Sequence, residues 1–135
     1  MKIHSLVVVF ALVLALGTGP GAAQLSPYGR WLAEDINGGG VIDRLQTTLE
    51  ITPEGRATGF GGCNAFTGSV TITGAAVAFG PLASTRKACP PAVMDQESKF
   101  HQVLAAAKGW RIDEQQRKLM LTDAAGKVVA RLTQL

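Results

Sequence analysis

The residues of this chain that could carry chemistry are two cysteines, two histidines and a scatter of hydroxyls and carboxylates. His4 falls in an apolar leader, so a Ser-His-Asp triad would have to use His101. Neither Ser84 nor Ser98 has the glycine-flanked turn between a strand and a helix that exposes an activated serine. The sequence places no two carboxylates at a catalytic separation. We therefore expect no catalytic residue, no cofactor and no enzymatic activity.

The two cysteines, Cys63 and Cys89, allow only one disulfide pairing. A metal site would need a third and a fourth ligand, and no histidine lies near either cysteine. We expect a disulfide and no metal, with a reactive thiol pair or a soft-metal site as the alternative. Closing this loop would stabilise the fold by about 3–4 kcal/mol in the loop-entropy model. That is a large share of the roughly 5–15 kcal/mol typical of a whole domain.

One carboxylate stands at a spacing that could matter for chemistry. Glu97 precedes His101 by four residues, which puts the two on the same face of a helix. No third group or nucleophile accompanies them, so we expect a solvent-exposed pair rather than a catalytic dyad.

Residues 1–23 have the three-part layout of a secretory signal peptide. A basic start precedes an unbroken apolar run from Leu6 to Leu16, and the small residues Gly21 and Ala23 suit a signal peptidase. The run is shorter than the about 20 residues of a membrane span, so we expect no stable membrane anchor. Cleavage near Ala23 would leave residues 24–135 as a periplasmic or secreted domain, in a compartment that favours disulfides.

The charge of the chain gives no sign of a nucleic-acid partner. The chain has 13 basic and 10 acidic residues, a formal charge of +3, and loss of Lys2 with the signal peptide lowers it to +2. No basic run is interleaved with aromatics as a nucleic-acid groove would require.

Short segments with β character recur between Gly-, Pro- and Asn-containing turns throughout residues 24–135. Several alternate apolar and polar residues, which favours antiparallel strands buried on one face. The eight predicted strands are 30–36, 46–51, 56–61, 69–73, 76–79, 110–113, 118–122 and 128–132.

One long segment, residues 92–108, has apolar residues at helical spacing, with Asp95, Glu97 and Lys99 on the predicted polar side. Prolines stand just before it, and Gly109 just after it is a plausible helix cap. The sequence therefore predicts one α+β domain, mostly antiparallel, with about eight short strands in a curved or barrel-like sheet and one α-helix.

Five segments together resemble the META domain family, also called HslJ-like. They are Trp31, GFGGCNAFTG (59–68), TRKAC (85–89), ESKF (97–100) and LMLTDAAGKVVARL (119–132). The resemblance implies a small bacterial envelope domain of antiparallel strands and one helix. It also implies a link to heat shock and to tolerance of the antibiotic novobiocin, with no enzymatic activity established for the family.

From the resemblance and the residues together we expect an exported, non-enzymatic envelope binding or stress-response module, monomeric, with an envelope protein or a small apolar ligand as partner. The alternatives are an inhibitor of an envelope hydrolase and a carrier of a small apolar ligand. Asn64 and Thr85, in the matching motifs, are candidate binding residues, although an asparagine after a cysteine also suits a turn.

Overall fold

The computed structural model describes residues 25–135. The predicted signal peptide, residues 1–23, lies outside the described residues. Within the described part of the chain, no helix is both long and apolar enough to cross a membrane.

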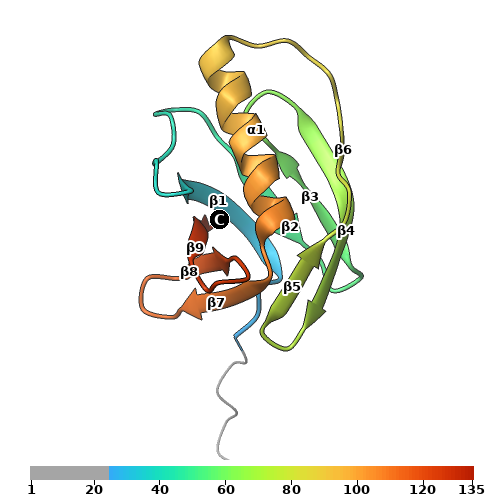
Figure 1. Ribbon diagram of the computed structural model, residues 1–135, viewed down its shortest axis with the longest axis vertical. Coiled ribbons are helices and arrows are strands. Elements are labelled where there is room, and N and C mark those ends of the chain that lie inside the picture. The colour runs from blue at the N-terminus through green and yellow to red at the C-terminus, as the bar shows by residue number, and fades with distance from the viewer. Residues whose placement is uncertain (1–24) are drawn as a thin grey trace, which may run out of the picture.

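Nine strands and one helix make up the described chain (Figure 1). The strands are β1 Gly29–Ile36, β2 Thr48–Ile51, β3 Arg56–Phe60, β4 Ala65–Thr73, β5 Ala76–Phe79, β6 Ala83–Ser84, β7 Gly109–Asp113, β8 Lys118–Thr122 and β9 Val128–Gln134. The helix α1 spans Pro91–Ala106, between β6 and β7.

The strands form one sheet in the order β3-β2-β1-β9-β8-β7-β5-β4-β6, and β3 also pairs with β4. This extra pairing closes every strand except β6 into a ring. All the pairings are antiparallel. The predicted α+β class, with a mostly antiparallel curved sheet and one helix, is confirmed. The ring has a weak point between β5 and β7, which share one residue pair, Ala76 with Gly109.

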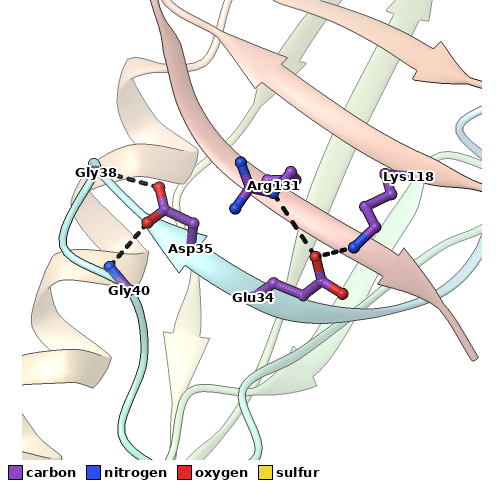
Figure 2. Close-up of polar contacts among 6 residues, drawn as sticks. All are labelled: Glu34, Asp35, Gly38, Gly40, Lys118 and Arg131. Atoms are coloured by element: carbon purple, nitrogen blue, oxygen red, sulfur yellow. Dashed lines mark hydrogen bonds and ion pairs between the residues drawn. The ribbon is translucent and has the colours of Figure 1, made fainter. Parts of the chain in front are cut away.

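A β-bulge in β1 sets which side chains enter the core. The register with β9 slips between Ala33 and Asp35, so Glu34 is the additional residue. Ala33 and Ile36 are both buried, whereas the two acidic residues between them are only partly covered. Figure 2 shows the Glu34 carboxylate directed toward Lys118 on β8 and toward Arg131 on β9, the latter at 3.7 Å.

The neighbouring Asp35 holds the turn after β1. Its two carboxylate oxygens accept the backbone N–H groups of Gly38 at 2.9 Å and of Gly40 at 2.8 Å (Figure 2). Both glycines have positive φ angles, 77° and 70°, which glycine adopts without steric cost.

The helix α1 crosses one side of the ring (Figure 1). Pro90 is its N-cap and Pro91 its first residue, where a missing N–H is tolerated. Phe100 and Leu104 are fully buried and belong to one core cluster with residues of the sheet such as Leu49 and Leu121. The helix therefore closes the core of the ring with its apolar face.

Candidate functional site

The GCN motif forms the short connection between β3 and β4. Gly61 donates its N–H to the carbonyl of Asn64 at 2.9 Å, which closes the turn. Cys63 and Asn64 are both buried, with 3% of their surface exposed. This connection is therefore part of the core rather than a surface loop.

A disulfide joins this connection to the segment that leads into the helix. Cys63 and Cys89 are bonded, with their Cα atoms 6.0 Å apart. The bond therefore fixes the β3–β4 connection beside the start of α1.

The helix contributes a buried carboxylate to the same place. Glu97 Oε2 accepts the backbone N–H groups of Cys63 at 2.9 Å and of Asn64 at 2.6 Å, and Oε1 accepts the Asn64 side-chain N–H at 2.8 Å. Only 5% of Glu97 is exposed. The predicted solvent-exposed pair with His101 is therefore wrong, because Glu97 turns inward to three N–H donors.

These donors control the ionisation of Glu97. Burial by itself would raise the pKa of this carboxyl group, because a charged group loses solvation. The Asn64 side chain, the backbone N–H groups of Asn64 and Cys63, and nearby His101 outweigh burial and lower the pKa below its ordinary value of 4.5. Glu97 is therefore a charged hydrogen-bond acceptor at neutral pH.

Asn64 connects Glu97 to the TRKAC segment. Its Oδ1 atom accepts the Thr85 hydroxyl at 2.9 Å and the Lys87 N–H at 2.6 Å. Its side-chain N–H group also donates to the Lys87 carbonyl at 3.2 Å. The structure thus brings together the predicted site residues Asn64 and Thr85 and both cysteines, through hydrogen bonds within the protein and one disulfide.

The residue before Glu97 also points inward. Gln96 accepts the N–H of Ile42 at 2.7 Å and donates to the Thr47 hydroxyl at 3.0 Å. Thr47 in turn donates to the Gly61 carbonyl at 2.9 Å. The adjacent side chains Gln96 and Glu97 of α1 therefore hold two separate connections of the sheet. Gln96 binds the connection between β1 and β2, and Glu97 binds the connection between β3 and β4.

Sequence reasoning assigned Glu97 to the polar side of the helix and did not single out Gln96. The only signal for Glu97 was its place in the ESKF segment of the family resemblance, because hydropathy treats buried and exposed carboxylates alike. Gln96 had no signal, since an isolated glutamine is typical of a solvated helix face.

The chemistry available to this cluster is limited by its own hydrogen bonds. Both oxygens of Glu97 and both polar atoms of the Asn64 side chain have partners inside the protein. Within residues 25–135, no group of three or more His, Cys, Asp or Glu side chains is placed to hold a metal ion. The cluster is thus built to fix three segments of the chain together.

The ring of antiparallel strands, its single helix and the disulfide-bonded GCN connection define a small β-rich domain of a recognised class. The META domain family model matches residues 23–134, and the chain belongs to this family. No curated protein sequence matches the chain.

Three solved structures share the fold. An NMR structure of a protein has a TM-score of 0.58 at 22% identity, covering 78% of this chain and 88% of its own. An NMR structure of a protein from Burkholderia xenovorans has a TM-score of 0.58 at 21% identity, covering 84% and 93%. The crystal structure of a DUF4847 family protein from Bacteroides vulgatus has a TM-score of 0.52 at 16% identity, covering 66% and 59%. At these identities the likeness concerns the fold alone.

Proposed function

We propose that residues 24–135 act as an exported, non-enzymatic binding module of the bacterial envelope, with a role in stress tolerance. One observation carries this proposal: the polar groups of the GCN and TRKAC motifs are bonded to one another through Asn64 and Glu97. A site built for catalysis would keep a group free for the substrate. This motif instead stiffens the domain, as a scaffold that presents a binding surface requires.

The disulfide supports the exported location in this proposal. The Cys63–Cys89 bond ties the β3–β4 connection to the start of α1, and such bonds persist in oxidising compartments. A stiff, cross-linked domain also suits an envelope exposed to heat or antibiotics, because it resists local unfolding.

A complementation experiment tests this function. A strain lacking the gene is grown under heat or novobiocin and is supplied with the full chain or with residues 24–135 alone. We expect the full chain to restore growth and the chain without residues 1–23 to fail, because it would stay in the reducing cytoplasm. Equal rescue by both forms would refute an envelope function, and no growth defect in the deletion strain would refute the stress role.

One alternative, a carrier of a small apolar ligand, would need room for that ligand in the domain. Side chains such as Phe100, Leu104 and Leu132 are fully buried in the core of the ring, so a carried ligand would lie outside it.

A further inference from the structure

Two cationic residues lie in the segment that connects β6 to α1. Arg86 and Lys87 are both exposed, and among residues 25–135 neither lies within ion-pair distance of a carboxylate. The chain over residues 85–89 contains no helix, strand or turn, and Figure 1 shows it along the outside of the domain. The segment therefore presents an arginine and a lysine to a partner that approaches from outside.

One buried amide holds the backbone on both sides of Arg86. The Asn64 Oδ1 atom accepts the Thr85 hydroxyl at 2.9 Å and the Lys87 N–H at 2.6 Å, and its Nδ2 atom donates to the Lys87 carbonyl at 3.2 Å. The Nδ2 atom also donates to Glu97 at 2.8 Å, which fixes the orientation of the amide. The residues before and after Arg86 are therefore both tied to Asn64.

The disulfide holds the far end of this segment. Cys89 is bonded to Cys63, which is buried in the β3–β4 connection. Pro90 follows, and a proline restricts the residue before it to extended backbone conformations. A segment that has one conformation before binding loses little conformational entropy on binding, which is how rigid inhibitors reach high affinity for proteases. We call residues 85–89 the Arg86 segment.

The backbone groups of Arg86 differ from those of its neighbour. Within the described residues, the Arg86 N–H and carbonyl make no hydrogen bond, whereas both groups of Lys87 are bonded to Asn64. A serine protease polarises the carbonyl of the bond that it attacks with the N–H groups of its oxyanion hole. Because the Lys87 carbonyl is turned to Asn64, the Arg86 carbonyl is the available one. The peptide bond presented to a protease is therefore the one between Arg86 and Lys87.

We propose, building on the proposed binding role, that the Arg86 segment occupies the active site of a trypsin-like serine endopeptidase and inhibits it. The partner is a protease whose specificity pocket carries a carboxylate, which pairs with the exposed Arg86 side chain.

The contacts of Asn64 explain why binding leads to inhibition and not to digestion. Attack by the protease serine on the Arg86 carbonyl carbon forms an ester bond to the serine oxygen and breaks the bond to the Lys87 nitrogen. The serine proton passes through the protease histidine to that nitrogen, which becomes an amine. Thr85 and Lys87 are both bonded to Asn64, so the amine stays beside the ester, attacks it again and restores the peptide bond before water enters.

The test is inhibition of trypsin, the probe for this class of protease, by the purified protein with its disulfide formed. We expect an inhibition constant below about 1 μM with a chromogenic arginine substrate, and a chain that mass spectrometry finds mostly intact after the assay. Chymotrypsin, whose specificity pocket is apolar, should not be inhibited. The proposal is overturned if trypsin keeps its full activity or if it cuts the Arg86–Lys87 bond rapidly.

Three variants locate the effect in Arg86. Arg86→Ala removes the side chain for the specificity pocket and should weaken inhibition about a hundredfold or more, as loss of a central interface residue does. Lys87→Ala, the matched control, removes the neighbouring exposed cation and should weaken inhibition less than about fivefold. Arg86→Tyr should transfer inhibition from trypsin to chymotrypsin. Equal effects of the two alanine substitutions, or trypsin inhibition that survives in Arg86→Tyr, would contradict the proposal.

A fourth variant tests the tether without disturbing the core. Thr85→Val removes the hydroxyl bonded to Asn64 from an exposed residue, so trypsin should cut the Arg86–Lys87 bond roughly threefold to tenfold faster, as for one lost hydrogen bond. Thr71→Val, at an exposed position of β4, is the matched control and should be cut as slowly as the wild type. An unchanged rate of cleavage in Thr85→Val would refute the tether.

This experiment fails independently of the proposed envelope function, because it uses purified protein and no growth assay. Rescue of the deletion strain by Arg86→Ala, together with no inhibition of trypsin by the wild type, would leave the envelope function standing and overturn the role of the Arg86 segment. Inhibition of trypsin by the wild type, with no growth defect in the deletion strain, would support the Arg86 segment and contradict the stress role.

Discussion

The Asn64 side chain donates an N–H to the Glu97 carboxylate at 2.8 Å, while its backbone N–H donates to the same carboxylate at 2.6 Å. Glu97 belongs to α1 and Asn64 to the connection between β3 and β4, 33 positions apart in the chain. A buried carboxylate with three N–H donors is stable only while all of them are in place. The GCN connection and the helix are thus predicted to lose their fixed arrangement together.

The first prediction concerns the amide of Asn64. Asn64→Asp keeps the shape but places an oxygen opposite Glu97 and opposite the Lys87 carbonyl, where an N–H now donates to both. We expect a loss of about 2–4 kcal/mol in the free energy of unfolding, measured by urea denaturation at neutral pH. Asn37→Asp, at an exposed turn position, is the matched control and should change the free energy of unfolding by less than about 0.5 kcal/mol. Similar values for the two variants would contradict a structural role for Asn64.

The second prediction concerns the disulfide. Reduction, or replacement of Cys63 and Cys89 together by serine, should lower the free energy of unfolding by about 3–4 kcal/mol, because the open chain gains entropy. For a domain of this size that corresponds to a fall in melting temperature of roughly 10–25 °C. Calorimetry with and without reductant provides the measurement. Two titratable thiols in the exported protein would show that the pair is not bonded in its natural compartment.

The third prediction uses a glycine as a probe of the space around Glu97. A Cβ atom at Gly61 would lie 2.6 Å from Glu97 Cγ and 2.8 Å from its Oε2 atom. Gly61→Ala should therefore destabilise the domain by about 1–3 kcal/mol, as overpacking does. At Gly39 the nearest atom to a Cβ is the Ile36 carbonyl oxygen at 3.5 Å, an ordinary contact. Gly39→Ala should leave stability within about 0.5 kcal/mol, and an equal effect of the two substitutions would contradict tight packing at Gly61.

The fourth prediction concerns export. Amino-terminal sequencing of the protein recovered outside the cytoplasm should begin at Gln24, because Gly21 and Ala23 are the small residues that a signal peptidase accepts. Ala23→Arg should block this cleavage and cause the precursor to accumulate. Recovery of the wild-type chain at full length in the membrane fraction would show that residues 1–23 act as an anchor instead.

Hydropathy and turn residues predicted much of the fold. The alternating strands, the single helix and its proline start at Pro90 and Pro91 need only local information, because each follows from periodicity or from backbone restrictions. The start of β4 was not predicted correctly from the local pattern. The predicted strand began at residue 69, whereas β4 begins at Ala65. Gly68 weakens the β pattern there, and its lack of a side chain admits Leu82, whose Cδ2 would lie 2.7 Å from a Cβ.

Other features depended on contacts between distant segments. Gly109 was predicted to cap the helix, but α1 ends at Ala106 and Gly109 begins β7. A Cβ at Gly109 would lie 2.6 Å from Thr122 Oγ1, so strand pairing is the reason for this glycine. The inward turn of Glu97 likewise depends on donors from the β3–β4 connection, which no helical pattern can reveal. Within the candidate site, the cysteines, Asn64 and Thr85 could be predicted from the sequence, but the buried Glu97 carboxylate that joins them to the helix could not.

The most direct test of the account is the unfolding free energy of the wild type and of Glu97→Gln, measured in urea from pH 7 to pH 3. Glu97 has a pKa lowered in the folded state from 4.5, so its charge stabilises the fold above that pH, and this contribution is lost as the pH falls through the folded pKa. A glutamine side chain at this position cannot present two acceptor oxygens to the three donors. We therefore predict that the unfolding free energy of Glu97→Gln is lower than that of the wild type by about 2–4 kcal/mol at pH 7, and that this difference shrinks below about pH 4.5. Asp95→Asn, which removes an exposed carboxylate paired with Lys99 on the same helix, should show a deficit below about 0.5 kcal/mol throughout. The claim that the Glu97 carboxylate locks the GCN connection to the helix would be contradicted in two ways. Either Glu97→Gln would have the same unfolding free energy as the wild type at pH 7, or the difference between the two proteins would stay constant down to pH 3.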